Sequence, residues 1–254
     1  MGSLPSADYL GLFLSRLTLD NTELLFGLAV SSVVGMLQYI YSVLLIRHEK
    51  RGPFPLWMHT FYLAHDSSWL VMLLHANFTH QPHWFLILMP LGLIIWNAME
   101  LYCLYHVVTT ERQAVFSAYY GKNPTLRQAL VHTSAMTLVM YSIIQLGLVL
   151  FGEGCILQWF CLTNVVVIGG PASEWLERGS RRGLSIGLAL VSAVGTVFTF
   201  GPFGFWVLGL PEVFDQPRYY LVGIVMTLLS LLDVAIVASY PPKTPTSGSP
   251  LPVW

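Results

Sequence analysis

Three carboxylic acids, Asp66, Glu100 and Asp233, lie inside long apolar stretches of the sequence that contain no Lys or Arg to neutralise them. A charged side chain near the centre of a bilayer costs about 2.5–3.5 kcal/mol and is usually kept for a function. Asp66 lies near the middle of its stretch, whereas Glu100 and Asp233 each lie about four residues beyond the middle of theirs. At 1.5 Å per helical residue, these two share a layer roughly 6 Å from the midplane, so we predict that they face each other across a cavity.

Removal from water favours the neutral form of a carboxylic acid, which is the form that a general acid needs. Glu100, Asp233 and Asp66 are therefore candidate catalytic residues. The alternative is that each is a hydrogen-bonded tie between helices, as polar side chains in membranes often are. That alternative explains any one of the three as well as catalysis does, but it explains all three together less well.

Two neighbours of Glu100 lie on its face of a helix, because Trp96 is four residues and Asn97 three residues before it. We predict that the Asn97 amide donates a hydrogen bond that orients the Glu100 carboxyl group. Trp96 offers an aromatic face that can stabilise a cation. Ordinary packing in a helix bundle is the alternative for Trp96.

Asp66 has a similar setting, with Tyr62 four residues before it and Trp69 three residues after it. Aromatic walls beside an acid suit carbocation chemistry on an apolar substrate, since aromatic faces attract cations. His65 is adjacent to Asp66 and could belong to a proton relay. We therefore predict that Tyr62, His65 and Trp69, together with Trp96 and Asn97, contact the substrate.

Several kinds of chemistry are not indicated. His59 and His65 are six residues apart, and no HExxH or two-His-one-carboxylate spacing occurs, so no metal site and no cofactor is predicted. The lysines lie outside the apolar stretches, which excludes a retinal Schiff base within them. No DDxxD-type acidic pair is present to hold a magnesium-bound diphosphate.

The elements that must position these side chains are membrane-spanning helices. The composition is 55% hydrophobic and only 10% charged, far from a soluble domain, and the net charge of −1 does not indicate nucleic-acid binding. We predict an all-α, multi-pass membrane protein, one bundle of about seven helices over residues 1–240, followed by a disordered tail at 241–254. Stretches long enough to cross a bilayer lie at 24–46, 55–76, 84–107, 129–151, 155–172, 184–206 and 219–239.

The basic residues predict how this bundle is oriented. With seven spans, ten of the twelve Lys and Arg residues fall on one side of the membrane and only Arg16 and Arg218 on the other. Because cytosolic loops are rich in Lys and Arg, we expect the N-terminus to face the lumen and the C-terminal tail to face the cytosol.

The segment Trp96-Asn97-Ala98-Met99-Glu100-Leu101-Tyr102, together with a single Asp233 on the last span, resembles the fungal integral-membrane terpene cyclases. These enzymes act in meroterpenoid and indole-diterpene pathways. The segments Tyr9-Leu10-Gly11-Leu12-Phe13 and Trp57-Met58-His59-Thr60-Phe61-Tyr62 are similar to the ascofuranone-pathway branch. In the paxilline-type branch we expect Asn four residues before the Glu and Trp directly before it, whereas here Asn97 is three residues before Glu100 and Met99 is adjacent.

The resemblance implies a metal-independent isomerase in secondary metabolism, located in the endoplasmic reticulum membrane. Glu100 or Asp233 would protonate the terminal epoxide of a prenylated (farnesyl-type) aromatic substrate, and the other carboxylate would take the final proton. The partners implied are this lipophilic substrate and membrane lipid, with no obligate protein partner. A non-enzymatic transporter or receptor, and a sterol-isomerase-like enzyme, are the alternatives.

Overall fold

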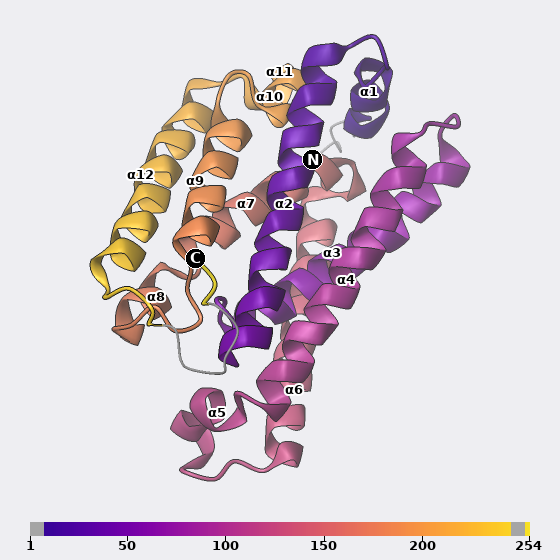
Figure 1. The fold of residues 1–254 in the computed structure, drawn as a ribbon. Coiled ribbons are helices and arrows are strands. Elements are labelled where there is room, and N and C mark those ends of the chain that lie inside the picture. Colours follow the sequence, from indigo (N-terminus) through magenta and orange to yellow (C-terminus); the bar gives the residue numbers. More distant parts are fainter. Residues whose placement is uncertain (1–7, 245–251) are drawn as a thin grey trace.

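The computed structural model describes residues 8–244 and 252–254, and within these ranges the chain is helical and contains no strand. The predicted all-α class is thus confirmed for the described residues. The long helices stand roughly side by side (Figure 1) and are α2 (Thr22–Glu49), α3 (Leu56–Thr79), α4 (Phe85–Thr109), α6 (Leu126–Phe151), α9 (Ile186–Phe200) and α12 (Pro217–Ser239). Shorter elements connect or cap them: α1 (Tyr9–Arg16), α5 (Arg112–Tyr120), η1 (Glu153–Cys155), α7 (Ile156–Gly169), α8 (Ala172–Arg178), α10 (Phe205–Gly209) and α11 (Pro211–Phe214).

Six helical segments among the described residues are long and apolar enough to cross a membrane, which supports a multi-pass membrane protein. They are Thr22–Glu49, Phe85–Thr109, Leu126–Phe151, Ile156–Arg178, Ile186–Gly209 and Pro217–Ser239. The remaining predicted span, 55–76, corresponds to α3, which is 24 residues long but is not among these six segments. Helix α3 carries three histidines and Asp66, of which His59, His65 and Asp66 are buried and His75 is exposed. The count of seven and the orientation of the termini stay predictions.

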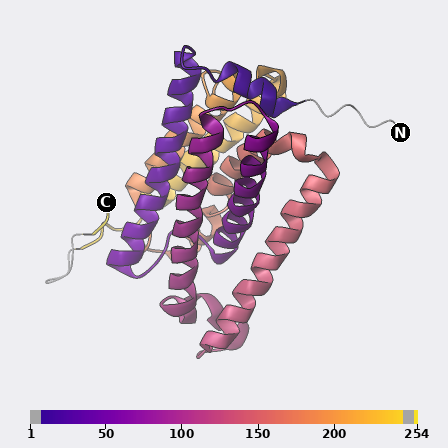
Figure 2. The same cartoon turned by 90° about the vertical axis from the view of Figure 1, so that its right-hand side faces the viewer.

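Helix α3 lies at the centre of one half of the bundle, where it packs against α4 and α6. The other half is formed by α2, α9 and α12, with α9 packed between the other two. Trp69, Leu73 and Leu93 are fully buried between α3 and its neighbours. Helix α6 leans away from the other helices at one edge (Figure 2), and most of its surface is apolar and exposed, as a lipid-facing helix requires.

Helix α1 lies at the end of the bundle where α10 and α11 also lie (Figure 1), and its Phe13 ring contacts the Phe205 ring of α10 with centroids 5.5 Å apart. Arg16 on α1 pairs with Glu212 on α11 and donates to the Gly209 carbonyl oxygen at 3.3 Å. The hydrogen bond from the Arg16 guanidinium group to the Glu212 carboxylate lowers the pKa of Glu212 to about 2. The contact ties the start of the described chain to the turn that follows α9.

Part of the predicted tail makes defined contacts. Lys243 Nζ lies 2.5 Å from Glu49 Oε1 and 2.9 Å from the Val253 carbonyl oxygen, and Val253 is buried. Ser185 donates a hydrogen bond to the main-chain oxygen of Trp254. For residues 245–251, which lie outside the described residues, disorder stays a prediction.

Candidate active site

A cavity of about 170 Å³ lies within the bundle, between α2, α3, α4, α7 and α10. Most of its wall is apolar or aromatic. Its lining residues are Leu28, Ser31, Ser32, Gly35, Gln38, Tyr39, Phe54, Met58, His59, Tyr62, Asp66, Phe85, Met89, Trp96, Glu100, Leu157, Phe160, Thr163, Asn164, Val167, Phe205 and Trp206. Two of the three predicted catalytic acids, Asp66 and Glu100, therefore face one cavity.

The cavity is elongated along the helices. On α4 its lining residues run from Phe85 to Glu100, which are fifteen positions or about 22 Å apart. On α2 the lining runs from Leu28 to Tyr39. One side reaches the outer surface of the bundle, because Ser32 lines the cavity and is also exposed. This shape suits a long flexible hydrocarbon chain.

Glu100 is buried at the polar end of the cavity and is held by two other helices. Tyr39 on α2 donates its hydroxyl hydrogen to Glu100 Oε1 at 2.7 Å, and His59 Nδ1 on α3 lies 2.6 Å from Glu100 Oε2. The other ring nitrogen of His59, Nε2, is buried and has no partner among the described residues. Sequence reasoning placed neither Tyr39 nor His59 in the site, because neither lies near Glu100 in the sequence.

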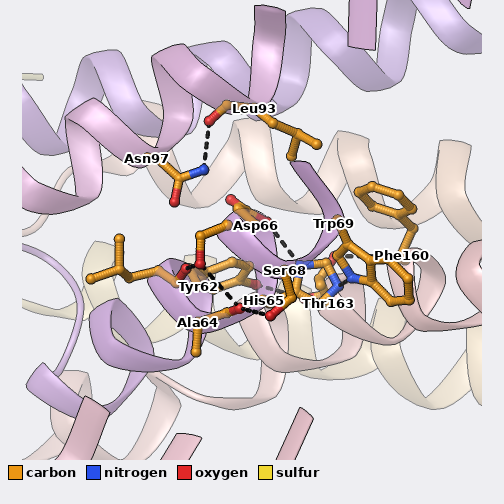
Figure 3. Close-up of polar contacts among 12 residues, drawn as sticks. Tyr62, Ala64, His65, Asp66, Ser68, Trp69, Leu93, Asn97, Phe160 and Thr163 are labelled. Carbon is orange, nitrogen blue, oxygen red and sulfur yellow. Dashed lines mark hydrogen bonds and ion pairs between the residues drawn. The ribbon is translucent and has the colours of Figure 1, made fainter. Parts of the chain in front are cut away.

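Asp66 is held within its own helix (Figure 3). His65 Nδ1 lies 2.8 Å from Asp66 Oδ1, and the Trp69 indole N–H donates to His65 Nε2. Trp69 is fully buried and stacks on Phe160 of α7, with ring centroids 5.4 Å apart. His65 thus contacts Asp66 directly and Trp69 contacts it through His65, and neither of the two lines the cavity.

The other predicted substrate-contacting residues differ in where they lie. Tyr62 lines the cavity and donates its hydroxyl hydrogen to the Thr163 carbonyl oxygen at 2.7 Å, which joins α3 to α7. Trp96 also lines it. Asn97 does not, and its amide donates to the Leu93 carbonyl oxygen at 2.8 Å on its own helix (Figure 3). The predicted hydrogen bond from Asn97 to Glu100 is therefore wrong, since the Asn97 amide donates to Leu93, and the described donors to Glu100 are on other helices.

Asp233 does not line this cavity. It is buried on α12, the helix that packs mainly against α9, and its Oδ1 has no hydrogen-bond partner among the described residues. Glu100 is thus paired with Tyr39 and His59 and not with Asp233. A catalytic role for Asp233 stays a prediction from the sequence.

The loop between α2 and α3 forms an end wall of the cavity through Phe54. Arg178 donates to the carbonyl oxygens of Gly52 at 2.9 Å and Pro53 at 3.3 Å, and the Trp175 indole donates to Pro53 at 2.7 Å. Glu111 Oε1 accepts from the Gly52 amide at 2.8 Å. Helix α8 and the chain after α4 therefore hold Phe54 in place.

Replacing Arg178 with Met should lower the thermal stability of the protein in detergent, because buried carbonyl groups lose a charged hydrogen-bond donor. Hydrogen bonds to charged groups contribute about 1.5–3 kcal/mol each. The measurement is the melting temperature from tryptophan fluorescence. Arg182→Met is the matched control, since Arg182 is exposed. Equal melting temperatures for the two variants would show that the hydrogen bonds from Arg178 to Gly52 and Pro53 do not stabilise the protein.

Comparison of the chain with protein-family models, with curated proteins and with solved structures gave no match.

Proposed function

We propose that the chain is a membrane-embedded cyclase that protonates the terminal epoxide of a prenylated, farnesyl-type substrate and closes rings through a carbocation. The observation that carries this proposal is a buried glutamate, Glu100, hydrogen-bonded to Tyr39 and His59 at one end of a long apolar cavity. The resemblance to fungal integral-membrane terpene cyclases, and the presence of Glu100 within its motif, support the same reaction.

The reaction needs an acid, a folded hydrocarbon chain and protection from water. A proton donated to the epoxide oxygen breaks the adjacent C–O bond, and an alkene of the same chain attacks the carbon left cationic. Loss of a proton from carbon ends the reaction, so that substrate and product are isomers. An apolar cavity excludes the water that would otherwise capture the cation early.

Aromatic side chains surround the path of the cation. Tyr62, Trp96, Phe160 and Trp206 line the cavity from four different helices. Their faces attract positive charge, by about 2 kcal/mol or more where water is absent. This stabilisation is greatest for the cationic intermediates, which is what lowers the barrier to ring closure.

The test is to supply an epoxyfarnesyl phenol to microsomes that contain the chain and to analyse products by mass spectrometry. We expect a product of unchanged mass with altered retention, absent from microsomes without the chain. A sterol alkene supplied in parallel tests the isomerase alternative. Turnover of the sterol with none of the farnesyl substrate would overturn the proposed substrate class.

One feature favours a transporter as the second candidate. Helix α9 ends at Phe200, and after Gly201-Pro202-Phe203-Gly204 the short α10 places Phe205 and Trp206 on the cavity. Broken helices at a central site are common in secondary transporters. Uptake of a labelled farnesyl phenol into proteoliposomes, without chemical conversion, would support transport and contradict the cyclase.

A further inference from the structure

The two carboxylates on the cavity have different hydrogen-bond partners. We propose that the Glu100–His59 pair holds the proton that starts the reaction, and that Asp66, positioned by His65 and Trp69, accepts the proton that ends it. This assignment rests on the proposed cyclase function. It extends that function by giving each acid a distinct role and by making His65 and Trp69 positioning residues.

The direction of the hydrogen bonds around Asp66 follows from Trp69. An indole nitrogen can only donate, so His65 Nε2 must accept and cannot itself carry hydrogen. The single hydrogen of the neutral ring is then on Nδ1, which donates to Asp66 Oδ1 at 2.8 Å. Asp66 Oδ1 is therefore an acceptor, and any proton that Asp66 gains must go to Oδ2.

His65 cannot change this arrangement easily. A second proton on its ring would point an N–H group at the Trp69 N–H, and both side chains are fully buried. Trp69 stacks on Phe160, and the His65 ring stacks on Phe61 with centroids 5.9 Å apart. His65 is thus a fixed donor to Asp66 and not a member of a proton relay.

The Glu100–His59 pair, which lines the same cavity, has a different hydrogen-bond pattern. Glu100 Oε1 accepts from Tyr39, but the 2.6 Å contact between Glu100 Oε2 and His59 Nδ1 can have its proton on either atom. His59 Nε2 has no partner among the described residues, so no donor opposes a second proton on this ring. A proton can therefore be held by Glu100 or by His59 without breaking another hydrogen bond.

These differences order the proton transfers. Glu100 Oε2 gives its proton to the epoxide oxygen, and the C–O bond breaks. Glu100 is left as a carboxylate that accepts from Tyr39, and from His59 once the single hydrogen of that ring has moved from Nε2 to Nδ1. After ring closure, a C–H bond adjacent to the cation breaks, its electron pair forms an alkene, and the proton goes to Asp66 Oδ2. Exchange with water after product release returns Asp66 and Glu100 to their starting states.

Nitrogen NMR of ¹⁵N-histidine-labelled protein tests the positioning without any substrate. The His65 signal, identified by its loss in His65→Asn, should show a hydrogen on Nδ1 and none on Nε2. In Trp69→Phe the opposing donor is absent, so a second tautomer or a doubly protonated ring should appear. A wild-type His65 with hydrogen on Nε2 would overturn the inference.

Product analysis tests the roles. Asp66→Asn keeps an oxygen to accept from His65 but cannot take a proton, so substrate should be consumed and the products should shift to other alkene isomers or water-captured alcohols. Trp69→Phe should shift them in the same direction. Substrate left intact by Asp66→Asn would overturn the assignment. A wild-type protein that converts no substrate would instead contradict the proposed function, while the NMR result would stand independently.

Discussion

Glu100→Gln should reduce turnover of the epoxyfarnesyl substrate by about 10²–10⁴-fold, the range by which a positioned general acid accelerates reactions. Glutamine has nearly the same shape and still offers an oxygen to the Tyr39 hydroxyl group, but it has no acidic proton. The measurement is product formed per minute by purified protein in lipid nanodiscs.

The control for this variant is Glu111→Gln. Glu111 is also a buried glutamate, but it is not on the cavity, and a glutamine oxygen can still accept from the Gly52 amide. Its turnover should stay far closer to that of the wild type than the turnover of Glu100→Gln does. Asp233→Asn in the same assay tests the pairing expected from the sequence. If Asp233→Asn folds and loses turnover while Glu100→Gln retains it, Glu100 is not the acid.

The second large effect concerns the break between α9 and α10. A Cβ atom on Gly204 would lie 2.3 Å from the Phe198 carbonyl oxygen and 2.9 Å from those of Gly201 and Thr199. These are main-chain atoms, so no side chain can move to make room. Gly204→Ala should therefore displace α10, lower the melting temperature and remove turnover, because Phe205 and Trp206 leave the cavity wall.

Gly92→Ala is the matched substitution, since a Cβ atom there meets nothing within 4 Å. Gly92 lies within α4, where alanine is favoured over glycine by about 1 kcal/mol. Its melting temperature should equal or exceed that of the wild type. A Gly204→Ala protein with wild-type melting temperature and turnover would show that the break tolerates a side chain.

The candidate acids could be found from the sequence because an acidic residue inside an apolar stretch can be recognised without knowing which residues lie near it in space. Tyr62 and Trp96 could also be found, since helical spacing places them beside those acids. Helical spacing does not show which partner comes from another helix. The bonds from Tyr39 and His59 to Glu100 cross 61 and 41 positions of the chain, and no local pattern marks them.

Depth in the membrane was an incomplete guide to which residues meet. Equal distance from the midplane places Glu100 and Asp233 in one layer, but it does not say toward which neighbour each helix turns its polar face. Helix α12 packs mainly against α9, and the cavity lies among other helices. For Asn97, the nearby Leu93 carbonyl oxygen competed for its amide, as main-chain acceptors often do for short polar side chains.

The exposed position of Ser32 has a consequence for how molecules reach the acid. Ser31, Ser32 and Gly35 are small residues on α2 that line the cavity, and Gly35 lies against Trp96 of α4. If the six apolar segments lie in a bilayer, this opening faces hydrocarbon and not water. A lipophilic substrate dissolved in the bilayer then enters the cavity laterally between the helices. Its rate of binding depends on its concentration in the lipid more than on its concentration in the surrounding water.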